Sequence, residues 1–203
     1  AVEPNIWNGC FVLDSLTVNG QEVTKTNLTR NRLEVLLPVG LIPGGTINLS
    51  IHFDLHLPPA DSHHIFGFKE RQINLVDWYP FIVPYINGKW VLHNPWFYGE
   101  HLTYEAADYD VTVNITEGTN VVIASSGEEV PAQAADSHRY TLEAGRAFAL
   151  SFSDAYQVAS KQVGDVTVYS YYFPAYKTSA LAVLDDTALA VGIYSKKFGP
   201  YTH

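Results

Sequence analysis

The chain has 203 residues, of which 47% are apolar, and a formal net charge of −9. This composition predicts a folded chain with a sizeable core and excludes extensive disorder. The acidic balance, with no run of more than two Lys or Arg residues, argues against nucleic acid as a partner. Cys10 is the single cysteine, which excludes an internal disulfide and a multi-thiolate zinc site within the chain.

Neither a membrane span nor a signal peptide is predicted from the sequence. No apolar run reaches the roughly 20 residues that cross a bilayer, so no membrane span is predicted, and no signal-peptide pattern is present. The sequence contains no methionine, and we therefore expect its N-terminus to be truncated. The compartment stays open, with an exported or cell-envelope location favoured.

Short β-strands separated by turn residues are predicted over most of the chain. Residues 10–18 alternate apolar and polar positions and end at Asn19-Gly20, a typical hairpin turn. Residues 47–57 alternate without a break, and Pro58-Pro59 ends that strand. Residues 60–74 are predicted to form a loop. Further strands are expected at 33–37, 109–115, 121–124, 139–142, 148–152 and 166–173.

From Pro174 the pattern becomes helical and stops at Gly199-Pro200. The predicted fold is therefore mainly β, a saddle-like or sandwich domain of many short antiparallel strands with one C-terminal α-helix. Such a helix needs a packing partner, and little sequence follows it, so we expect a fragment whose chemistry lies downstream. Its apolar stripe, with three- and four-residue steps, consists of Leu181, Leu184, Ala188, Val191, Tyr194 and Phe198.

The eight histidines do not form a recognisable metal site. His52 and His56 share one strand face, but residues four apart on a strand are about 13 Å apart and cannot bind one ion. His63 and His64 form a loop cluster with Asp61 in which no geometry is fixed by the sequence. No metal ligand and no catalytic residue is predicted in this chain.

Asp108 and Asp110 flank Tyr109 and would share one face of a strand. A hydrolase with paired carboxylates would use such an arrangement. Exposed charges at a strand entrance are the favoured interpretation.

An aromatic block is the densest feature of the sequence. Its rings would form a platform for sugars or apolar peptide side chains if exposed, and part of the core if buried. The core is the favoured interpretation. The principal members of the block are Trp78, Tyr79, Trp90 and Trp96.

Several segments together resemble bacterial members of the aminopeptidase N family, which are zinc metallopeptidases of the gluzincin type. The resemblance extends from about Leu16 to the end of the chain. Its motifs follow in the order seen in the family: Asn74–Pro80, Gly99-Glu100, Ala107–Val113, Val122–Gly127 and Lys197–Tyr201.

The resemblance implies an N-terminal β-domain over residues 1–163 and the start of a thermolysin-like catalytic domain over residues 164–203. The family's zinc-binding His-Glu-x-x-His and its substrate-gripping motif would fall after His203. The chain itself is expected to hold no cofactor, and zinc is expected in the parent protein. The implied partners are the missing catalytic domain and a peptide substrate, with the β-domain capping the active-site cleft.

Gln72, with Glu70 beside it, is the position where the resemblance implies a contact with substrate. In some family members a Gln of the β-domain lines the pocket for the first side chain, and Gln72 lies close to that spacing. We therefore expect Gln72 and Glu70 at the edge of a substrate pocket. The other interpretation of Gln72 is a loop amide.

Two further functions stay open. A β-sandwich module could bind carbohydrate or protein through Trp78, Trp90 and Trp96 as an aromatic platform. A parent protein of the same family without zinc could act as a scaffold.

Overall fold

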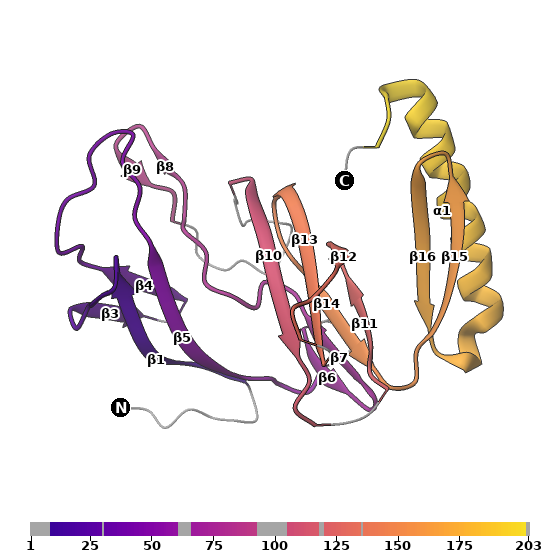
Figure 1. Ribbon diagram of the computed structural model, residues 1–203, viewed down its shortest axis with the longest axis horizontal. Helices are drawn as coiled ribbons and strands as arrows, with labels where there is room; N and C mark the ends of the chain where they lie inside the picture. Colours follow the sequence, from indigo (N-terminus) through magenta and orange to yellow (C-terminus); the bar gives the residue numbers. More distant parts are fainter. Residues whose placement is uncertain are drawn as a thin grey trace. The chain divides into compact units, whose positions relative to one another are not determined.

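The computed structural model describes residues 9–29, 31–60, 66–92, 105–117, 120–134 and 136–201. The chain divides into two compact units, Ala1–Pro59 and Ala60–His203 (Figure 1).

The first unit is built from antiparallel strands, with β1 paired to β5 along its length from Cys10↔His56 to Val18↔Leu49. Asn19 and Gly20 both adopt positive φ angles (50° and 79°), as a two-residue hairpin turn requires. The three-stranded sheet has the order β2-β1-β5, and β3 and β4 form a separate hairpin. The strands are β1 (Cys10–Val18), β2 (Gln21–Glu22), β3 (Thr26–Thr29), β4 (Arg32–Val35) and β5 (Leu49–His56).

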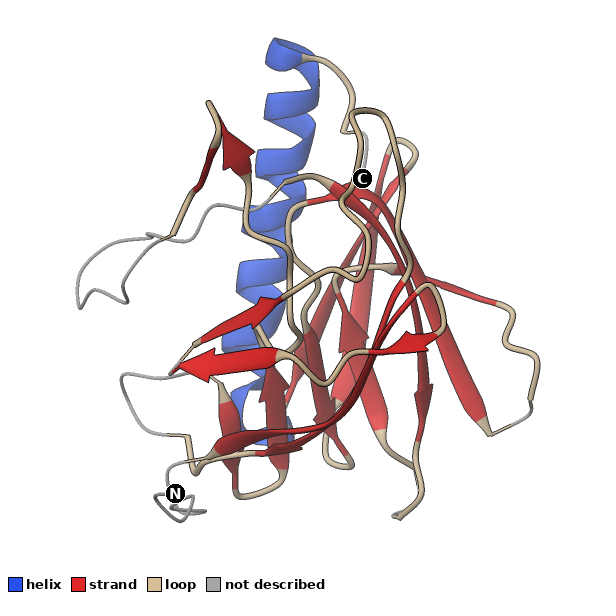
Figure 2. Cartoon of the chain, turned by 90° about the vertical axis from the view of Figure 1, so that its left-hand side faces the viewer, coloured by secondary structure: helices blue, strands red, loops and turns tan. Residues whose placement is uncertain are grey.

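The second unit contains a three-stranded sheet, β10-β13-β12, and a four-stranded sheet, β11-β14-β7-β6, both antiparallel. Figure 2 shows the strands of the chain in red and its C-terminal helix in blue. The first consists of β10 (Ala107–Asn114), β12 (Glu128–Val130) and β13 (Ser137–Gly145). The second consists of β6 (Gly67–Lys69), β7 (Gln72–Leu75), β11 (Val122–Ser125) and β14 (Leu150–Ser153). A short hairpin joins β8 (Tyr85–Ile86) to β9 (Lys89–Trp90).

Residues of both sheets contribute to the core of this unit. Phe148 is 1% exposed and packs with Ile123, Tyr140 and Leu150. Gly127 is required beside this cluster, because a Cβ there would lie 2.7 Å from the Thr141 carbonyl oxygen and 2.8 Å from the Phe148 ring.

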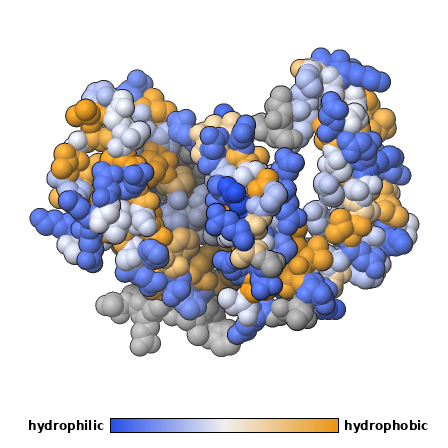
Figure 3. Space-filling view, viewed as in Figure 1, coloured by the Kyte–Doolittle hydropathy of each residue, from blue (hydrophilic) through white to orange (hydrophobic). Residues whose placement is uncertain are grey.

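The C-terminal part is a hairpin covered by a helix. β15 (Gln157–Val163) pairs with β16 (Val166–Tyr172), and after the 3₁₀ turn Pro174–Tyr176 the helix α1 (Lys177–Phe198) packs on both strands. Leu184 and Ala188 are buried at this contact. We call β15, β16 and α1 the hairpin–helix layer; apolar side chains, orange in Figure 3, are exposed along it.

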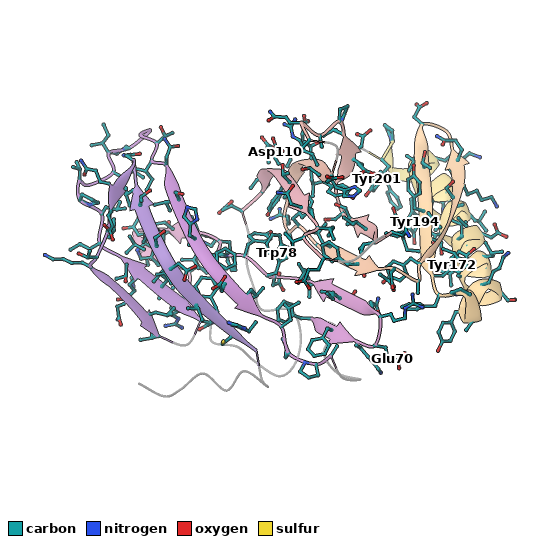
Figure 4. All side chains as sticks on the ribbon, turned by 60° about the horizontal axis from the view of Figure 1, so that its bottom comes forward. Glu70, Trp78, Asp110, Tyr172, Tyr194 and Tyr201 are labelled. Carbon is teal, nitrogen blue, oxygen red and sulfur yellow. The ribbon has the colours of Figure 1, made fainter. Side chains whose placement is uncertain are left out.

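The predicted fold class is confirmed, since the described residues are mainly antiparallel β-strands followed by one C-terminal α-helix. The predicted helix stripe is correct at Leu184 and Ala188. It does not extend to Tyr194 and Phe198, which are 62% and 82% exposed (Figure 4 labels Tyr194). The hairpin turn at Gly164 lies beside Gly192, so the last turns of the helix have no strand beneath them.

The prediction of a loop at 60–74 was wrong, because β6 and β7 form a hairpin there. The boundary expected after residue 163 falls at the turn between β15 and β16. That division into domains stays a prediction.

Within the part of the chain that the structure describes, no helix is both long and apolar enough to cross a membrane.

Candidate functional site

Gln72 belongs to a group of polar side chains that links β7 and β14, two neighbouring strands of the four-stranded sheet. Gln72 and Asn74 lie on the same face of β7, because residues two apart on a strand point the same way. The Gln72 Nε2 donates to the Tyr156 hydroxyl at 2.5 Å, and that hydroxyl lies 2.7 Å from the Ser151 hydroxyl. Ser151, on β14, donates to the Asn74 Oδ1 at 2.6 Å. We call these four residues the Tyr156 network.

The ring of Tyr156 extends the network towards the hairpin–helix layer. Its centroid lies 5.2 Å from that of Phe173 and 6.3 Å from that of Tyr171. The phenol therefore bonds to the sheet through its hydroxyl and packs on residues of the layer through its ring.

Arg71, at the turn before β7, forms a bidentate ion pair with Asp154. The Nε–Oδ1 and Nη2–Oδ2 distances are both 2.8 Å. The hydrogen bonds from Arg71 lower the pKa of Asp154 below its ordinary value. Both side chains are about half exposed, at 61% and 47%, so the pair contributes little stability by itself.

Glu70 is the other residue of this turn (Figure 4) and adopts a positive φ of 52°. It is exposed, whereas Gln72 is partly buried against Tyr156. The structure thus separates the two predicted residues, one at the hairpin tip and one in the Tyr156 network. Their place at the edge of a substrate pocket stays a prediction.

Trp78 and Tyr79 of the aromatic block pack against the core cluster. The Trp78 indole donates to the Phe148 carbonyl at 3.2 Å. The Tyr79 hydroxyl accepts the Phe148 N–H at 3.0 Å and donates to the Tyr109 hydroxyl at 3.1 Å. Burial, with the contact to Tyr109, raises the pKa of Tyr79.

Trp90 has a different environment in the β8–β9 hairpin. It is 56% exposed and meets Tyr85, 60% exposed, at a centroid distance of 4.9 Å and an interplanar angle of 61°. Two rings inclined in this way do not form a flat stacking surface. Trp96 lies outside the described residues, so a continuous aromatic platform has no support from the rings that the structure describes.

Asp108 and Asp110 each have a separate partner. Asp110 forms a two-pronged pair with Arg139, with Nε–Oδ1 and Nη2–Oδ2 distances of 2.8 and 2.6 Å. Asp108 accepts the backbone N–H of Ala144 at 2.8 Å. These bonds favour the interpretation of structural charges over that of a catalytic carboxylate pair.

No group of three or more His, Cys, Asp or Glu residues is arranged to hold a metal ion within the described ranges. His52 and His56 share one face of β5, as predicted, and that face is exposed. Asp61, His63 and His64 lie outside the described residues. The described side chains therefore do not fit a zinc ion, and no zinc ligand is assigned among them.

Tyr156 is the residue of this region that sequence analysis missed. It follows a strand without any motif around it, and its partner Gln72 is 84 positions away in the sequence. No local signal predicts such a pairing.

Comparison with solved structures shows a similarity of fold. The fold is similar to that in the crystal structure of an M1 zinc metallopeptidase from Deinococcus radiodurans, with a TM-score of 0.54 and 18% sequence identity. The similarity covers 96% of this chain and 46% of that chain, so the chain spans about half the length of that protein. At this identity the similarity establishes the fold alone. No family profile and no curated protein sequence matches the chain.

Proposed function

We propose that this chain is the non-catalytic N-terminal part of a zinc metallopeptidase of the aminopeptidase type. The observation that supports this most strongly is the similarity of fold to an M1 zinc metallopeptidase over 96% of the chain. The order of the sequence motifs, from Asn74–Pro80 to Lys197–Tyr201, supports it independently.

In this proposal the β-strands of residues 1–163 cap one side of the active-site cleft. β16 and α1 are the first elements of the catalytic domain, which begins near residue 164. Gln72 and Glu70 lie at the edge of the pocket for the first side chain of a peptide substrate.

Zinc would supply the polarising charge for attack of water on the first peptide bond. In this proposal its ligands belong to the His-Glu-x-x-His segment that the family resemblance implies after His203. No catalytic step is assigned to the described residues.

The test compares the full-length gene product with residues 1–203. The full-length sequence should contain His-Glu-x-x-His, and its protein should release an amino acid from an aminoacyl dye substrate. A chelator should abolish this release, and residues 1–203 alone should release nothing. A full-length sequence without the motif, together with no chelator-sensitive release, would contradict the proposal.

A further inference from the structure

The attachment of the hairpin–helix layer to the rest of the second unit depends on side chains. Within the described residues, no strand ladder joins β15 or β16 to the other sheets. The helix packs on its own hairpin. The orientation of this layer must therefore be set by side chains and by the short connection from β14.

Tyr156 lies within this connection, between the end of β14 at Ser153 and the start of β15 at Gln157. Its hydroxyl bonds to Gln72 of β7 and Ser151 of β14. Its ring packs on Tyr171, which belongs to β16, and on Phe173, which follows that strand. One side chain thus contacts the sheet with its polar end and the layer with its apolar body.

A neighbouring ion pair supports the same connection. The ion pair between Arg71 and Asp154 binds the β6–β7 turn to the residues that precede Tyr156.

We propose that Tyr156 fixes the orientation of the hairpin–helix layer on the four-stranded sheet, and that Gln72 is a positioning residue that acts through the Tyr156 hydroxyl. A partly buried phenol with two polar partners has one favoured position, because any rotation leaves those partners unsatisfied. The connection is then a fixed joint. This inference goes beyond the proposed function and does not depend on it.

The joint predicts a distance that can be measured. Thr112 on β10 and Leu189 on α1 are both exposed and lie outside the Tyr156 network. Spin labels at Thr112→Cys and Leu189→Cys, with Cys10→Ser, report the distance between the layer and the sheets by pulsed electron spin resonance. The unmodified joint should give one narrow distribution.

Tyr156→Phe keeps the ring and removes the hydroxyl, so it should broaden or shift this distribution. Gln72→Ala should do the same, and the double variant should change it no further than Tyr156→Phe alone. The matched control is Tyr169→Phe, which removes a hydroxyl from a side chain of the same layer that is 56% exposed. The control should leave the distribution unchanged.

A folded Tyr156→Phe protein with the unmodified distribution would overturn the proposal, even if its unfolding temperature were lower. If Tyr156→Phe does not fold, Ser151→Ala takes its place, since it removes the other hydroxyl that bonds to Tyr156. An unchanged distribution in folded Ser151→Ala would overturn the proposal equally.

Discussion

At the scale of single residues, Tyr79 illustrates how one side chain serves the core. Its ring meets Trp78 and Tyr109 edge-on, with centroid distances of 5.3 and 5.8 Å. Its hydroxyl satisfies the Phe148 N–H. The fully buried Phe148 is thereby held by both packing and a hydrogen bond to its backbone.

Tyr79→Phe should lower the free energy of unfolding by about 1–2 kcal/mol, because the partly buried Phe148 N–H and Tyr109 hydroxyl lose a partner. Urea unfolding followed by fluorescence measures the change. Tyr85→Phe is the control, since Tyr85 is 60% exposed, and it should have almost no effect. Equal stabilities of the Tyr79 and Tyr85 variants would show that the hydroxyl of Tyr79 contributes nothing.

The ion pairs of Asp110 and Asp154 predict that the stability of the protein depends on pH. Hydrogen bonds from Arg139 and Arg71, respectively, lower the pKa values of these carboxyl groups below the ordinary 3.8. The stability that they contribute is therefore present above about pH 4 and is lost as the pH falls through the lowered pKa values. Because the side chains are exposed, the contribution of each pair is small.

Asp110→Asn should therefore reduce the difference in unfolding temperature between pH 7 and pH 3. The exposed Glu143→Gln is the control and should leave that difference unchanged. Differential scanning calorimetry at low salt measures both. If the difference in unfolding temperature is as large in Asp110→Asn as in the unmodified protein, the pair with Arg139 does not contribute to the pH dependence of stability.

At the scale of elements, the contact between α1 and its hairpin includes Gly192 in the interior of the helix. A Cβ at Gly192 would lie 3.5 Å from the Val163 Cγ1, an ordinary van der Waals contact. Glycine thus costs helix stability here without any steric requirement for it.

Gly192→Ala should raise the free energy of unfolding by about 0.5–1 kcal/mol, the usual gain when alanine replaces glycine within a helix. Gly164→Ala, in the adjacent hairpin turn, should instead destabilise the protein, because Gly164 has a φ of 61°. Thermal unfolding of both variants compares them directly. Destabilisation by Gly192→Ala would show that the helix cannot accommodate a methyl group against Val163.

The elements that sequence analysis found are those with a strong local pattern. Residues 47–57 alternate regularly, and β5 is observed there with its apolar positions partly buried and its polar positions exposed. The β6–β7 hairpin was missed because Phe68 and Ile73 are exposed, so the segment has no apolar face of the usual kind. Its register is fixed by pairing with β14, which is distant in sequence.

The candidate site was predictable only in part, for the same reason. Gln72 and Trp78 were predicted as site residues from the sequence. Their partners, Tyr156 and Phe148 respectively, lie 84 and 70 positions away. Whether a ring belongs to the core or the surface depends on such distant partners. Trp78 and Trp90, which belong to the same aromatic block of the sequence, thus have different environments.

At the scale of the whole molecule, the described residues provide a β-rich scaffold with a hairpin–helix layer at its C-terminal end. Their fold corresponds to 46% of the chain of an M1 zinc metallopeptidase. The proposed function assigns the catalytic chemistry to the remainder of the full-length gene product and a supporting role to this part.

The zinc content of the two proteins tests this division of roles most directly. Metal analysis by mass spectrometry, after purification without added metal, should find about one zinc ion per full-length polypeptide. The same analysis should find essentially no zinc in residues 1–203. A full-length protein without zinc that also fails to bind it on addition, or stoichiometric zinc in residues 1–203, would contradict the proposal.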